Sequence, residues 1–182
     1  MLTLNIPQIE KWDEGKQEFI YVKAQTLQLE HSLVSLSKWE SKWHKAFLGR
    51  QEKTDEETLD YIRCMTLTKN VDPMVYKCLN KSAINQIKEY IDDSMTATVF
   101  SDNKSSSKGS REIVTAELIY YWMIALNVPF DPCQKWHLNR LLTLIQVCNI
   151  KNQPPKKMSR REILSRNASL NAARRQKYNT TG

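Results

Sequence analysis

Glycine is scarce in this chain, with only four residues among 182. Tight β turns and phosphate-binding loops rely on glycine, because glycine adopts positive φ angles without steric cost. The scarcity therefore disfavours a turn-rich all-β fold and a glycine-built phosphate cradle. No Walker motif, Gly-x-Gly-x-x-Gly or Gly-x-Ser-x-Gly occurs either, so the usual nucleotide and hydrolase sites are not expected.

The first 30 residues have the pattern of short strands. Residues 2–6, 19–22 and 26–29 are runs of β-prone residues, and a polar turn at 13–16 separates the first two. This pattern predicts a small antiparallel sheet or hairpin. We also expect residues 96–100 to form a further strand.

Helical periodicity starts at Ser32. Apolar residues then recur at spacings of three and four from Leu33 to Phe47, and Gly49 is expected to end that helix. Thr54 and Glu57 form a capping box that opens a second helix. Further helices are expected from Pro73, over 82–91, over 112–127 and over 133–148. The one at 112–127 is apolar nearly all round, which predicts a position in the centre of the core.

These patterns predict a mainly α (α+β) fold: a helical bundle with a small N-terminal antiparallel β-hairpin or sheet and a basic C-terminal helix. We expect an α-rich globular domain over residues 1–150. A Pro-Pro break at 154–155 would join it to a helical appendage over 151–182. The longest apolar stretch, residues 118–126, is too short to cross a bilayer, and no secretory signal is recognisable, so no membrane association is expected.

Charge divides the chain unevenly. Residues 151–182 contain nine Lys or Arg and one acid, a net charge of +8, whereas residues 1–150 contain 18 basic and 19 acidic residues, a net charge of −1. A neutral body with a strongly basic end is typical of an interaction segment for an acidic partner.

The basic segment is itself a predicted helix. Ser159 and Glu162 form a second capping box, which opens a helix that runs to about Lys177. Two arginine pairs would lie about 20 Å apart along it. Contact with an acidic protein surface is the favoured use, nucleic-acid binding is an alternative, and a solvated tail without a ligand is a third. The candidate contact residues are Lys156, Lys157, Arg160, Arg161, Arg166, Arg174, Arg175 and Lys177.

Residues that could carry chemistry are few. Cys133 and His137 stand four apart, and Cys133 at a predicted helix start is the best nucleophile candidate, but neither has a second supporting pair. Glu30, Asp60 and Glu117 are interpreted as caps or ion-pair partners. The four cysteines are expected to be reduced thiols, and Trp39, Trp43, Trp122 and Trp136 to be core residues. We therefore expect no catalytic residue, no metal, no cofactor and no enzymatic activity.

Several strings of residues resemble a known family. They are LEHSLVSLSKWE at 29–40, DYIRCMT at 60–66, ELIYYWM at 117–123, QKWHLNRLL at 134–142 and MSRRE at 158–162. Together they resemble small proteins of bacteriophages with long, non-contractile tails, which are classed as tail assembly chaperones. The resemblance covers most of residues 27–175.

The resemblance implies a helical protein in the cytoplasm of the infected bacterial host. Such a protein would coat the long tape-measure protein, keep it soluble and help tail-tube subunits polymerise around it. The family has no catalytic motif, so no residue roles are carried over. Alternatives are a structural virion component, such as a minor tail or connector protein, and a nucleic-acid-binding regulator. A homo-oligomer formed through the edge of the N-terminal sheet is a further expectation.

Overall fold

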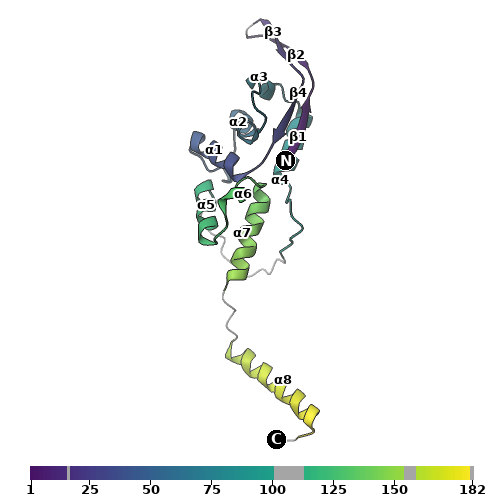
Figure 1. Ribbon diagram of the computed structural model, residues 1–182, viewed down its shortest axis with the longest axis vertical. Coiled ribbons are helices and arrows are strands. Elements are labelled where there is room, and N and C mark those ends of the chain that lie inside the picture. Colours follow the sequence, from purple (N-terminus) through teal and green to yellow (C-terminus); the bar gives the residue numbers. More distant parts are fainter. Residues whose placement is uncertain (16, 101–112, 154–158, 181–182) are drawn as a thin grey trace. The chain divides into compact units, whose positions relative to one another are not determined.

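A computed structural model describes residues 1–15, 17–100, 113–153 and 159–180 (Figure 1). The chain forms two compact units, residues 1–149 and residues 150–182, and each is described by itself. The predicted fold class is confirmed: the described chain is mainly helical, with a small antiparallel β part near the N-terminus.

The β part contains four strands, β1 (Leu2–Ile6), β2 (Ile9–Asp13), β3 (Glu18–Val22) and β4 (Gln25–Leu29). They form two antiparallel pairs, β1 with β4 and β2 with β3. Leu4 lies opposite Leu27, and both side chains are buried. The β2–β3 hairpin continues from the β1–β4 pair and extends beyond the neighbouring helices (Figure 1).

Seven helices begin among the described residues of the first unit. They are α1 (Leu33–Trp43), α2 (Asp55–Met65), α3 (Pro73–Lys77), α4 (Lys81–Asp92), α5 (Ala116–Ala125), α6 (Phe130–Cys133) and α7 (Leu138–Asn152). The starts of α1–α5 are set by side chains that accept backbone N–H groups. Ser32 and Thr54 each begin a capping box, while Asp72 and Asn80 cap α3 and α4.

The core joins the β1–β4 pair to the helices. Trp39 on α1 is almost fully buried, and its Nε1–H donates to the carbonyl oxygen of Glu57 at 2.8 Å. Leu29, Met65 and Met123 bring β4, α2 and α5 into the same cluster. Trp43, Trp122 and Trp136 are half-buried against it, so the four tryptophans are core residues as predicted.

The helix predicted over 133–148 is wrong at its start, because α6 ends at Cys133 and α7 begins only at Leu138. The structure corrects three further predictions about elements. The first helix ends at Trp43, not near Gly49, because His44 adopts a left-handed conformation (φ 51°) and donates its N–H to the carbonyl oxygen of Glu40. Residues 96–100 form no strand, and Val99 is exposed. The third correction concerns α5, which is shorter than predicted and not central: it buries only Ala116, Ile119 and Met123.

The second unit contains α8 (Arg160–Tyr178), which buries none of its residues. The predicted C-terminal helix is therefore present with nearly the predicted bounds. No helix among the described residues is long and apolar enough to cross a membrane.

Candidate functional site

Helix α8 has its own signals at both ends. Ser159 Oγ accepts the N–H of Glu162 at 3.2 Å, and Glu162 Oε2 accepts the N–H of Ser159 at 2.7 Å. At the other end Asn179 adopts φ 54° and donates its N–H to the carbonyl oxygen of Arg175. An acid in the first turn and bases in the last turn suit the helix dipole. These local interactions explain why a helix without buried residues forms.

The structure brings six of the eight predicted contact residues onto this helix. Arg160, Arg161, Arg166, Arg174, Arg175 and Lys177 all lie in α8 and are exposed. Lys156 and Lys157 lie outside the described residues. With six basic residues and one acid, α8 has a net charge of +5.

The basic residues of α8 are spread around the helix. At about 100° per residue they cover about three-fifths of its circumference. The remaining face carries polar residues without positive charge, among them Ser165, Ser169 and Gln176. Exposed apolar side chains, Ile163, Leu164 and Leu170, lie between the basic ones. The helix is thus a cationic rod with one side that has no basic residue and carries the acid Glu162.

A second exposed surface lies on the β2–β3 hairpin. Trp12 stands directly opposite Phe19, with their rings 4.8 Å apart in an edge-to-face arrangement. Tyr21 extends the same face, because side chains two residues apart on a strand point to the same side. Trp12, Phe19 and Tyr21 are 46%, 64% and 53% exposed. Three large aromatic residues are therefore available for contact, and we call this set the aromatic hairpin face.

A third exposed surface lies on α5. Tyr121 and Ile124, one turn apart, are 62% and 64% exposed, although the helix is among the most apolar in the sequence. Leu118 and Ala125 lie beside them. We call these four residues the apolar α5 face. Exposed large apolar side chains that gather in this way are typical of interaction surfaces.

The histidines His31 and His137 lie at the centre of the first unit. Their rings are 5.1 Å apart, and both are buried. His31 Nδ1 lies 2.5 Å from the Tyr61 hydroxyl. His137 Nε2 lies 2.9 Å from the carbonyl oxygen of Tyr90, and the N–H of Asn139 donates to His137 Nδ1 at 3.3 Å. Both ring nitrogens of His137 are thus used within the fold.

Burial, and then the nearby His137, lower the pKa of His31 to about 3. Its imidazole is therefore neutral at pH 7. A buried neutral ring that is hydrogen-bonded to a tyrosine connects elements of the fold: here it joins the end of β4 to α2. The arrangement is typical of a structural histidine.

The spacing of four residues would place Cys133 and His137 on one face of a continuous helix, but the two residues do not lie in one helix. Helix α6 ends at Cys133, and α7 begins at Leu138. In the segment between these helices, His137 pairs with Ser32 in a β-bridge, which interrupts the helical conformation. The Cys133 thiol is buried at a helix end, so the expected dipole at a helix start does not act on it. In the described part of the chain, no three His, Cys, Asp or Glu side chains gather in a way that could hold a metal ion.

Two of the three candidate carboxylates, Glu30 and Asp60, have structural partners. Glu30 accepts the Tyr90 hydroxyl at 2.7 Å, and Asp60 pairs with Lys42 at 2.5 Å and with the Trp43 indole N–H at 2.9 Å. Glu117 is exposed in the first turn of α5. Ion pairing and hydrogen bonding therefore account for Glu30 and Asp60 as predicted.

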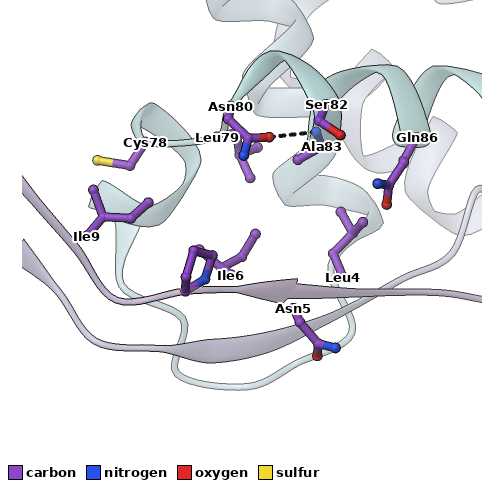
Figure 2. Close-up of a pocket in the computed structure, with 11 residues that line it drawn as sticks. Leu4, Asn5, Ile6, Ile9, Cys78, Leu79, Asn80, Ser82, Ala83 and Gln86 are labelled. Carbon is purple, nitrogen blue, oxygen red and sulfur yellow. Dashed lines mark hydrogen bonds between the residues drawn. The ribbon is translucent and has the colours of Figure 1, made fainter.

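A small hollow of about 110 Å³ lies between β1 and the start of α4 (Figure 2). Leu4, Ile6 and Ile9 line it from the strand side. Asn80 Oδ1, on its rim, accepts the N–H of Ala83 at 2.7 Å and so serves as the cap of α4. Its lining combines these apolar side chains with the uncharged polar side chains of Asn5, Ser82 and Gln86, and contains no His, Lys, Arg, Asp or Glu.

No family model, no curated protein and no solved structure matched the chain in the three comparisons. The candidate sites therefore rest on the geometry of this chain alone.

Two of the three exposed surfaces were not predicted. The aromatic hairpin face could have been found from the sequence, because Trp12 precedes the turn between two polar residues, and Phe19 and Tyr21 follow the turn two residues apart. The apolar α5 face could not, because an all-round apolar helix has the same pattern whether or not its outer face is covered.

Proposed function

We propose that this protein is a non-enzymatic tail assembly chaperone that binds the tape-measure protein of a long-tailed bacteriophage in the cytoplasm of the infected host. The observation that carries the proposal is the pair of exposed apolar surfaces on the first unit, the aromatic hairpin face and the apolar α5 face. The resemblance noted in the sequence supports the choice of partner.

The chemistry of these surfaces suits a long amphipathic helix as the partner. Tape-measure proteins are long helices with apolar stripes, which associate with one another until they are enclosed. Burial of apolar area stabilises a contact by about 25 cal/mol for each Å² removed from water. Two small surfaces give a modest affinity for each contact, so the coat is released when tail-tube subunits assemble.

Helix α8 contributes charge to the same task. Its arginines form bidentate hydrogen bonds with carboxylates, and arginine is enriched in protein interfaces. We propose that Arg160, Arg161, Arg166, Arg174, Arg175 and Lys177 contact acidic residues that flank the apolar stripe of the partner, together with Lys156 and Lys157.

Co-expression with a tape-measure segment tests the proposal. The unmodified chain should increase the soluble fraction of that segment. The paired variants Phe19→Ser with Tyr21→Ser, and Tyr121→Ser with Ile124→Ser, should each reduce the effect, because they remove apolar contact area without touching the core. A matched control is Thr3→Ser with Thr98→Ser, which changes exposed residues outside both surfaces.

The readout is the soluble fraction of the segment after centrifugation, with circular dichroism of each variant to verify folding. Unchanged precipitation in the presence of the unmodified chain would contradict the proposal. Equal activity of the control and both surface variants would show that the two apolar surfaces are not the contact.

A further inference from the structure

The arrangement of polar residues on α8 is more specific than its total charge. At about 100° per residue, Asn167, Asn171 and Arg174 lie along one strip of the helix surface. All three are exposed. Arg160 and Tyr178 lie on the same strip near its two ends. Side chains with amide and guanidinium groups therefore follow one line along the rod.

Positive charge lies on both sides of this strip, beyond the exposed apolar side chains of Ile163 and Leu170 on one side and Leu164 on the other. Arg166 and Lys177 lie on one flank, and Arg161 and Arg175 lie on the other. The only acid of the helix, Glu162, lies on the opposite side, next to Ser165, Ser169 and Gln176. Cations on both flanks of a polar strip suit a groove with anionic walls on either side.

From this arrangement we propose that α8 binds duplex DNA, with the Asn167–Asn171–Arg174 strip facing base edges in the major groove and the flanking cations contacting phosphates. The major groove is about 12 Å wide and admits an α-helix. Asn forms paired hydrogen bonds with adenine, and Arg does so with guanine. The major groove of A-form RNA is too deep and narrow for this contact, so duplex RNA is the less suitable ligand.

This inference does not depend on the chaperone function, which we place mainly on the two apolar surfaces of the first unit. It concerns a second ligand. Because the protein partner and DNA would use the same cations of α8, the two ligands are expected to compete.

Fluorescence anisotropy with the full-length chain tests the inference. The probe is a labelled 20-base-pair duplex of mixed sequence, titrated at 50 and 200 mM NaCl. Four phosphate contacts predict a slope of log K against log salt of about −3.6, and Arg166→Gln or Arg175→Gln should each reduce its magnitude by about 0.9. The variants are expected to fold, because α8 buries no residue.

Two double variants separate base contact from general charge. Asn167→Ala with Asn171→Ala changes the proposed strip. Ser165→Ala with Ser169→Ala changes two residues on the opposite face, and both variants keep the net charge of the helix. In selection from a random duplex library, the unmodified chain should enrich a preferred sequence. The Asn167→Ala with Asn171→Ala variant should enrich that sequence at least about tenfold less. The opposite-face variant should retain the preference.

Three results would overturn the inference. One is binding of poly-glutamate as tight as that of DNA, which would assign α8 to acidic protein surfaces. Another is tighter binding of duplex RNA than of DNA. The third is equal loss of sequence preference in the two double variants. If α8 does not bind DNA, the proposed solubilisation of the tape-measure segment by the first unit is unaffected. The two proposals are therefore tested separately.

Discussion

Glu40 on α1 accepts the N–H of Ala116, the first residue of α5, through Oε2 at 2.7 Å. Its other oxygen, Oε1, accepts the N–H of Phe47 at 2.8 Å. One nearly buried carboxylate therefore fixes two segments that are far apart in the sequence. Burial raises the pKa of Glu40, and the two backbone N–H groups oppose that effect. The contact determines where the apolar α5 face stands in the fold.

Replacement of Glu40 by Ala should lower the free energy of unfolding by roughly 2–3 kcal/mol, because two backbone N–H groups lose their acceptor. Urea denaturation at pH 7 measures the change. Glu89→Ala, which removes an exposed acid from α4, is the control and should change stability by less than about 0.5 kcal/mol. Equal effects of the two variants would contradict the role given to Glu40.

The stability of the first unit should fall in mild acid because of His31. Its pKa is about 3 in the folded protein and about 6.5 when unfolded. The unfolded state therefore binds more protons than the folded state between these values, so the folded state loses roughly 1.4 kcal/mol for each pH unit below 6.5. Urea denaturation at pH 7.0 and at pH 5.0 measures the difference.

His31→Gln should make stability less dependent on pH across this range, at the cost of a lower stability at pH 7. His44→Asn is the control, because His44 is exposed and asparagine also tolerates the left-handed conformation of that position. If His31→Gln and the unmodified chain lose the same stability between pH 7.0 and pH 5.0, His31 is not the group responsible.

The elements with local signals were those that the sequence predicted well. The capping boxes at Thr54 and Ser159 begin α2 and α8, and the proline at 73 begins α3, because these interactions join residues close in the chain. The position of α5 depends instead on Glu40, which lies 76 residues away. No local pattern contains that contact.

The same distinction applies to the candidate sites. The basic residues of α8 were identifiable because charge and helical spacing are properties of the sequence itself. The central histidine pair was not, because His31 and His137 meet only after β4 and α7 have come together. The interruption between Cys133 and His137 has the same origin: it follows from pairing with Ser32 in a distant segment.

Asn139 on α7 holds the C-terminal end of α4. Its Nδ2 donates to the carbonyl oxygens of Ile91 and Asp93, at 2.9 and 2.7 Å. Asn139→Ala should therefore destabilise the first unit by about 1–2 kcal/mol and speed amide exchange at the end of α4. Asn149→Ala, on the exposed side of the same helix, is the control. Unchanged exchange in α4 would show that this cap is dispensable.

Helix α8 should respond to its caps without affecting the first unit. Ser159→Ala removes the acceptor for the Glu162 N–H and should destabilise the helix by about 1 kcal/mol. Asn179→Gly should have the opposite effect, because glycine adopts the φ of 54° at this C-cap more readily. Far-UV circular dichroism measures the helix content, and amide exchange locates the change. Since α8 buries none of its residues, urea denaturation of the core, followed by tryptophan fluorescence, should be the same in both variants. A shift of that transition would mean that α8 contributes to the stability of the first unit.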